Sequence, residues 1–184
     1  LFFYLLLIKY TGGYSYINAA FFAVIFGEII LNQPYNFITQ KILDQTGIPV
    51  LNFNQDNLKE QPNIVVVSAA YDKNHPEVKE AKKRHLEILT YSEALGFFSK
   101  DSQVIAVPGI NGKTTITSLI AYLLEKAGLD PSYIIGAGEV FSLKSIAHYG
   151  KGNYFVIEAD EYRQSPEKSD SKFFDLSPQI EIIS

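Results

Sequence analysis

The stretch best suited to chemistry is a short loop near the middle of the chain, between an apolar run and an amphipathic pattern. Bound polyphosphate needs converging backbone N–H groups, a helix N-terminus and a cation that reaches the phosphates. The two glycines of the loop let the backbone come close, Lys113 supplies the charge, and the hydroxyl of Thr114 is suited to binding Mg²⁺. The candidate phosphate-binding residues are Gly109, Ile110, Asn111, Gly112, Lys113, Thr114 and Thr115.

The loop departs from the common phosphate-binding motif at one position. That motif has a first glycine where this chain has Val107. The alternative to a phosphate site is an ordinary strand-to-helix turn with a surface lysine. A buried strand, Gly-x-x-Gly-Lys-Thr and an apolar helix nevertheless follow one another in the order that the motif requires, which favours the phosphate site.

A second group of candidate residues is acidic and lies in "FVIEADEY". Glu158, Asp160 and Glu161 fall at the carboxyl end of a predicted strand, the edge where open α/β sheets bind ligands. A carboxylate there is suited to holding the same Mg²⁺ as Thr114, and three crowded acids are costly unless a cation shares them. The alternative is a solvated acidic turn.

A third and weaker signal is the pair Gly12 and Gly13 after the first apolar run. A dinucleotide site would have further glycines where Tyr10 and Ser15 stand, so a plain tight turn explains the pair equally well. The three histidines lack the spacing of a metal site, and we interpret them as structural or exposed.

The first half of the chain must provide alternating strands and helices. Apolar runs predict a strand at 1–8, a helix at 16–31 and a buried strand at 63–70. The pattern "NHPEVKEAKKRHLEIL" predicts a helix that begins near Pro76, with acidic residues early and basic residues late, as suits the helix dipole.

The second half repeats this alternation after a polar break in "YSEALGFFSKDSQ", which predicts a domain boundary near Lys100 or Asp101. It contains the strand "QVIAV", the loop, a helix closed by Gly128, and later strands at "SYIIGAG", "NYFVIEA" and "QIEII". The apolar face expected for the helix comprises Ile116, Leu119, Ile120, Leu123 and Leu124. Strands that alternate with helices indicate an α/β fold with parallel sheets.

Composition excludes several other classes of protein. A net charge of −4 and a pI near 5.4 argue against a general nucleic-acid or membrane-surface binder. The absence of cysteine excludes disulfides and fits a cytoplasmic protein. Polar residues interrupt every long apolar window, so no membrane insertion is expected. The chain begins at Leu1 and contains no Met, so we expect a fragment or a processed form.

The loop "GINGKTT" followed by "VIEADEY" closely resembles the Mur ligases, and within them the branch that joins L-alanine to UDP-N-acetylmuramate. The loop of that family, Gly-Thr-(His/Asn)-Gly-Lys-Thr, also lacks the early glycine, so Val107 agrees with the resemblance. The upstream segments "NIVVVSAAYDKNHPEVKEAKKR" and "ILTYSEAL" resemble the family's N-terminal nucleotide-sugar domain. The resemblance runs from about residue 12 to residue 184.

The resemblance implies two domains and an ATP-dependent reaction. Residues 1–100 would form a Rossmann-like UDP-sugar-binding domain, and residues 101–184 the first part of a P-loop-type, ATP-binding central domain. The implied activity is amide formation in peptidoglycan precursor synthesis, with ATP and Mg²⁺ as cofactors and UDP-N-acetylmuramate and L-alanine as substrates.

The resemblance also implies a role for each candidate residue. Lys113 would neutralise the transferring phosphoryl group, while Thr114 and Glu158 would hold Mg²⁺. The predicted substrate-site residues are Asp160 and Glu161, near the reacting group, and Gly12 and Gly13, which would face the UDP group.

Departures from the family keep alternatives open. Ile110 stands where the loop usually has Thr, and Tyr10 and Ser15 replace glycines of the UDP turn. The remainder of the central domain and the amino-acid-binding domain would lie beyond this sequence, so the chain alone is not expected to catalyse the reaction. The alternatives are the recycling ligase that attaches a murein tripeptide, a non-catalytic nucleotide-binding remnant, and a general P-loop kinase or ATPase. Oligomeric state is not indicated.

Overall fold

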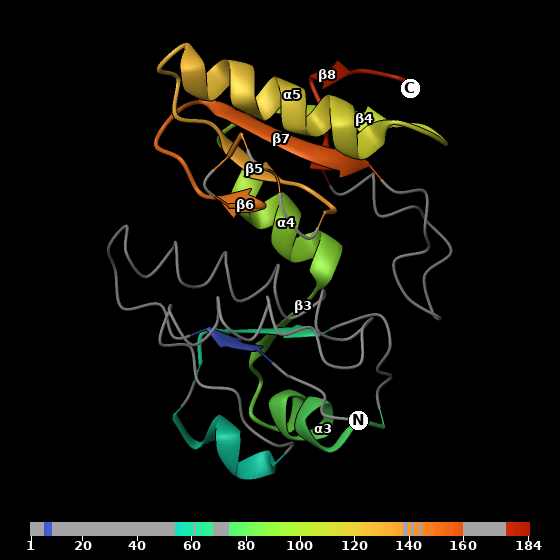
Figure 1. Cartoon of the computed structure of the whole chain (residues 1–184). Helices are drawn as coiled ribbons and strands as arrows, with labels where there is room; N and C mark the ends of the chain where they lie inside the picture. The colour runs from blue at the N-terminus through green and yellow to red at the C-terminus, as the bar shows by residue number, and fades with distance from the viewer. Residues whose placement is uncertain are drawn as a thin grey trace. The chain divides into compact units, whose positions relative to one another are not determined.

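The computed structural model divides the chain into two compact units, between Ala94 and Leu95 (Figure 1). It describes residues 6–8, 54–60, 62–67, 74–137, 140, 142–143, 145–159 and 176–184. Sheet strands and helices occur in both units, so the predicted α/β fold class is confirmed. The division lies within a helix, some residues before the expected boundary at Lys100 or Asp101, and the binding roles of the two predicted domains stay predictions.

The first unit contains a three-stranded sheet of order β1-β2-β3. Its elements are β1 (Leu6–Ile8), η1 (Gln55–Glu60), β2 (Ile64–Val67), α3 (Pro76–Lys83) and β3 (Glu87–Thr90). β2 and β3 are parallel, as expected, but β1 pairs antiparallel with β2. An apolar run indicates that a strand is buried and carries no information about its direction, which explains the difference.

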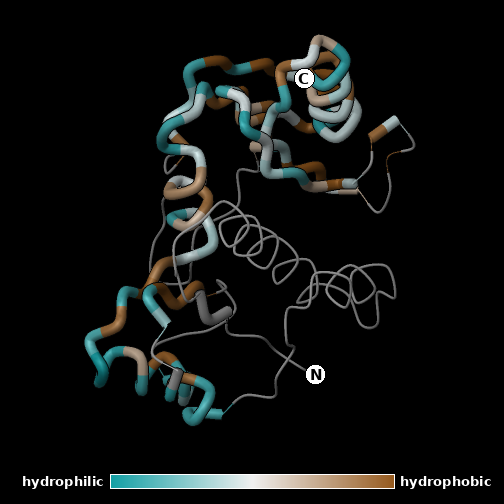
Figure 2. Tube along the Cα trace, turned by 90° about the vertical axis from the view of Figure 1, so that its left-hand side faces the viewer, coloured by the Kyte–Doolittle hydropathy of each residue, from teal (hydrophilic) through white to brown (hydrophobic). Residues whose placement is uncertain are grey.

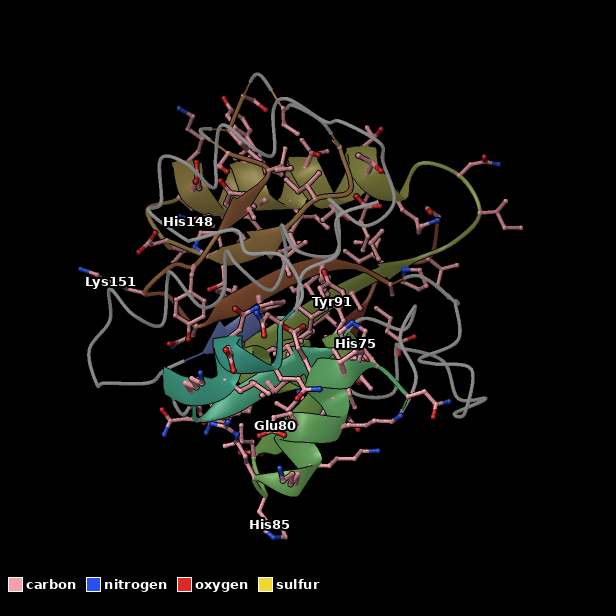
Figure 3. The ribbon with its side chains drawn as sticks, turned by 90° about the horizontal axis from the view of Figure 1, so that it is seen from below. His75, Glu80, His85, Tyr91, His148 and Lys151 are labelled. Carbon is pink, nitrogen blue, oxygen red and sulfur yellow. The ribbon has the colours of Figure 1, made fainter. Side chains whose placement is uncertain are left out.

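The helix α3 ends earlier than its sequence pattern predicted. The N–H of His85 donates to the carbonyl of Lys82 and the N–H of Leu86 to that of Ala81, at 3.1 and 3.0 Å, which is a Schellman motif. His85 takes the left-handed conformation of this motif, with φ 57°, and its side chain points away from the unit (Figure 3). Because glycine usually occupies that position, the sequence lacked the expected stop signal, and "EILT" forms β3 instead of a further helical turn.

A helix, α4 (Tyr91–Ser99), replaces the expected polar break. Its start is a capping box, in which the Glu93 carboxylate accepts the Thr90 N–H at 2.7 Å and the Thr90 hydroxyl accepts the Glu93 N–H at 3.3 Å. The Thr-x-x-Glu signal was present in the sequence, and the prediction of a break overlooked it.

The second unit contains a five-stranded sheet of order β6-β5-β7-β4-β8. Its elements are β4 (Gln103–Pro108), α5 (Lys113–Lys126), β5 (Ser132–Ile134), β6 (Ala147–His148), β7 (Tyr154–Ala159) and β8 (Ile180–Glu181). β5, β7, β4 and β8 are parallel, whereas β6 pairs antiparallel with β5. α5 packs against β7 and β4 (Figure 1), so the loop before α5 lies at the carboxyl edge of β4.

The face of α5 that packs on the sheet overlaps the expected one only in part, since Ile120 and Leu124 pack against the core as expected. Thr117 and Ala121 are buried, whereas Leu119 and Leu123 are 54% and 55% exposed. Apolar residues occupy more than one side of this helix, so periodicity alone placed Leu119 and Leu123 wrongly on the buried face. The core beneath α5 includes Ile105, Tyr133 and Val156.

Hydrophobic stretches, in brown in Figure 2, recur in both units, and each unit has its own buried cluster. Among the described residues, no helix combines the length and apolar character needed to span a bilayer.

Candidate functional site

The candidate site is the loop 109–112, which joins β4 to α5. Gly109 has φ 143° and Gly112 has φ 80°, conformations that side-chain-bearing residues rarely adopt. A Cβ at Gly109 would also collide with the backbone of Ser184, whose N–H donates to the Pro108 carbonyl at 3.0 Å. Both glycines are therefore required by the backbone, and Gly112 is the N-cap of α5.

Val107 lies within β4 and not in the loop. It is fully buried, and in the parallel register of β4 and β7 it stands opposite Glu158. The strand continues through Pro108, so the loop begins later than in a motif with glycine at this position. The valine is therefore compatible with a loop shaped by Gly109 and Gly112.

Lys113 is the first residue of α5 and its side chain folds back over the loop. Its Nζ donates to the carbonyl of Gly109 at 2.9 Å. The ammonium group thus lies beside the loop, at the N-terminal end of a helix of 14 residues. A helix N-terminus and a cation at the same place favour binding of an anion.

Thr114 and Glu158 meet directly, although 44 residues separate them in the sequence. The Thr114 hydroxyl donates to Glu158 Oε2 at 3.1 Å, and the backbone N–H of Gly136 donates to Glu158 Oε1 at 2.7 Å. Both side chains are partly exposed, so a ligand can reach them.

The separation of the oxygen pair is compatible with binding of Mg²⁺. Neighbouring ligands of octahedral Mg²⁺, each about 2.1 Å from the ion, are about 3 Å apart. The 3.1 Å between Thr114 Oγ1 and Glu158 Oε2 matches this spacing. Mg²⁺ is typically bound by one or two carboxylates together with phosphates and waters, so one hydroxyl and one carboxylate fit the ion. The described residues contain no group of three or more His, Cys, Asp or Glu side chains that could hold a metal by themselves.

The other predicted site residues have different outcomes. Ile110 is 89% exposed at the tip of the loop, and Asn111 and Thr115 are exposed beside it. The remaining four predicted site residues lie outside the described part of the chain: Gly12, Gly13, Asp160 and Glu161. Their roles stay predictions.

Sequence reasoning missed Gly136 as a site residue. It follows β5 in "SYIIGAG", at the carboxyl edge of a parallel strand next to β7. A glycine at the end of a parallel strand was the available signal, since ligands bind at this edge. The order of the strands was needed to bring it to Glu158.

A model of the Mur ligase family, catalytic domain, matches residues 34–103. The UDP-N-acetylmuramate--L-alanine ligase of Desulfitobacterium hafniense is 37% identical over 150 residues, which are 82% of this chain and 31% of that relative. An alignment of this length necessarily includes the loop at 109–112. The chain thus spans about a third of the length of this curated relative.

Two solved ligase structures share the fold. The UDP-N-acetylmuramate:L-alanyl-gamma-D-glutamyl-meso-diaminopimelate ligase from Neisseria meningitides has a TM-score of 0.70 and 26% identity, covering 82% of this chain and 50% of that one. The UDP-N-acetylmuramate-alanine ligase from Thermotoga maritima has a TM-score of 0.65 and 25% identity, covering 79% and 32%. Together with the family model and the sequence relative, these structures show that the chain belongs to the Mur ligase family.

Proposed function

We propose that this chain is part of an ATP-dependent ligase that joins L-alanine to the carboxylate of UDP-N-acetylmuramate in peptidoglycan precursor synthesis. The observation that carries the proposal is the contact of Thr114 with Glu158 directly behind the glycine loop. The names of the sequence relatives support the choice of substrates. Because the chain spans about a third of such relatives or less, the complete reaction belongs to a longer protein.

In this proposal the residues of the second unit bind and orient the phosphates of ATP. Backbone N–H groups of the loop and the N-terminus of α5 face the phosphates, and Lys113 exchanges the Gly109 carbonyl for a phosphate oxygen. Thr114 and Glu158 would hold Mg²⁺, which when bound would neutralise negative charge on the phosphates. The γ-phosphoryl group passes to the substrate carboxylate, ADP leaves, and the amine then displaces phosphate to form the amide.

The murein-tripeptide ligase is a second candidate function. The structure from Neisseria meningitides, with a TM-score of 0.70, belongs to a ligase whose name specifies L-alanyl-gamma-D-glutamyl-meso-diaminopimelate, a tripeptide, as the substrate. Both candidate functions use the same loop and the same acidic residue. They differ in the substrate that supplies the amine, which is L-alanine in one and the tripeptide in the other. A cytoplasmic location is part of either proposal.

The proposed nucleotide site is tested by removing its cation. We expect Lys113→Ala to weaken binding of ATP with Mg²⁺ by about tenfold or more, because a charge-assisted contact to phosphate is lost. Isothermal titration calorimetry on this chain measures the change.

Lys126→Ala is the matched control, since it removes the same charge from the other end of α5, where Lys126 lies 5.4 Å from the Tyr122 ring centre. Equal ATP affinity in wild type and Lys113→Ala would contradict the proposed site, as would an equal loss in both variants.

A further inference from the structure

The carboxylate of Glu158 is held at both of its oxygens by two different elements. Thr114, at the start of α5, donates to Oε2 at 3.1 Å, and Gly136, just after β5, donates to Oε1 at 2.7 Å. β7 lies between β5 and β4 in the sheet, so Glu158 stands on the middle strand, between its two partners. The two hydrogen bonds together fix the plane of the carboxylate.

The backbone that presents the Gly136 N–H is itself anchored. The Ala137 N–H donates to the Ile135 carbonyl at 2.9 Å and closes a tight turn around Gly136. The Ile135 N–H donates to the Ile146 carbonyl at 2.9 Å, and the Ile135 side chain belongs to the core. The donor is therefore preorganised, and the backbone at residue 136 has little freedom to move away from Glu158.

The space beside Gly136 is filled by the same carboxylate. A Cβ at this position would lie 3.1 Å from Glu158 Oε2, 3.2 Å from Oε1 and 3.3 Å from Cδ. These distances are shorter than ordinary van der Waals contacts. Since the turn is anchored, the Glu158 side chain has to give way when a methyl group is added.

We propose that Gly136 is a positioning residue for the metal ligand Glu158, and that its N–H and its missing side chain together aim Oε2 at the Mg²⁺ position beside Thr114. The inference rests on the proposed function, because it requires a nucleotide site with Mg²⁺ at Glu158. Residues that orient a metal ligand typically change metal affinity by about 10- to 100-fold when they are altered.

The test is Gly136→Ala, which keeps the N–H and adds only the methyl group. A non-hydrolysable ATP analogue is titrated into this chain by calorimetry, first in EDTA and then over a series of Mg²⁺ concentrations. We expect affinity in EDTA to stay within about twofold of wild type, while the Mg²⁺ concentration for half-maximal enhancement rises about tenfold. Glu158→Gln, which keeps the size but loses the charge, is expected to shift the Mg²⁺ dependence in the same direction.

Ala137→Gly is the matched control, since it changes the same turn by one methyl group and leaves the space beside Glu158 as it is. Its Mg²⁺ dependence is expected to equal that of wild type. An unchanged Mg²⁺ dependence in Gly136→Ala would overturn the inference and leave the proposed function standing, and an equal loss with and without Mg²⁺ would also overturn it. If wild type binds no nucleotide in either condition, the proposed function fails, and the inference fails with it.

Discussion

At the scale of single residues, Glu77 is a buried carboxylate whose partners come from another element. Its side chain is 1% exposed, and Oε1 accepts the Asn54 N–H at 3.0 Å and the Asn57 side-chain amide at 2.8 Å. Oε2 has no hydrogen-bond partner among the described residues. Arg84, the C-cap residue of α3, donates to the Leu58 carbonyl at 2.9 Å. Polar side chains of α3 and of its C-cap therefore hold η1 in place.

Replacing Glu77 tests this attachment. We expect Glu77→Ala to lower the free energy of unfolding by about 2 kcal/mol, because two partly buried hydrogen bonds lose their acceptor. Glu77→Gln keeps an acceptor oxygen at nearly the same position and is expected to lose less than half as much. Urea denaturation measures both. An alanine variant as stable as wild type would show that the two hydrogen bonds do not stabilise the fold.

At the scale of elements, α3 and α5 end with the same motif but with different residues. In α5 the Gly128 N–H donates to the Glu125 carbonyl and the Leu129 N–H to that of Leu124, at 2.9 and 3.0 Å. Gly128 has φ 73°, and His85, at the corresponding position after α3, has φ 57°. Glycine adopts this conformation readily, whereas histidine does so at a cost.

Introducing glycine after α3 and removing it after α5 are expected to have opposite effects on stability. We expect His85→Gly to raise the free energy of unfolding by about 0.5–1 kcal/mol and Gly128→Ala to lower it by about 1 kcal/mol. His85 is exposed, so its replacement sacrifices little packing. Urea denaturation measures both changes. Two variants that shift stability in the same direction would be incompatible with a cost set by the left-handed backbone.

At the scale of the whole molecule, Asp130 joins two turns of the second unit. It precedes β5, and its carboxylate bonds with His148 Nε2 and accepts the Lys151 N–H, each at 2.8 Å. The hydrogen bond with His148 is the main cause that lowers the pKa of Asp130, and the Lys151 N–H adds to it. This pair lies at the amino edge of β5, whereas the candidate site lies at the carboxyl edges of the parallel strands.

The lowered pKa of Asp130 predicts a loss of stability in acid. The contribution is fully present above the unfolded-state pKa of about 3.9 and is lost as the pH falls through the lower folded-state value. We expect wild type to be more stable than Asp130→Asn near neutral pH, by at most about 1 kcal/mol because the group is half exposed. The difference should shrink as the pH falls from about 5 to about 3. Urea denaturation at several pH values measures it, and a difference that grows in acid would contradict the prediction.

Much of the second unit followed from local patterns, because its signals are local. The strand, the glycine loop and the glycine that closes α5 each depend on a few neighbouring residues, and all lie where they were expected. The end of the first unit was harder to predict from the sequence. β3 and α4 were missed because His85 replaced the usual glycine stop and because the capping box was read as a polar break. Predicting the buried face of α5 required knowledge of which side of the helix the sheet covers.

The sequence alone determined the α/β class, the glycine loop with its lysine, and the family resemblance, because these depend on residue types at fixed short spacings. Only the tertiary structure decided that Glu158 contacts Thr114 and that Gly136 donates to Glu158. Both contacts follow from the strand order β5-β7-β4, which brings distant carboxyl ends to one edge of the sheet. No local pattern encodes strand order, since it results from the packing of the whole unit.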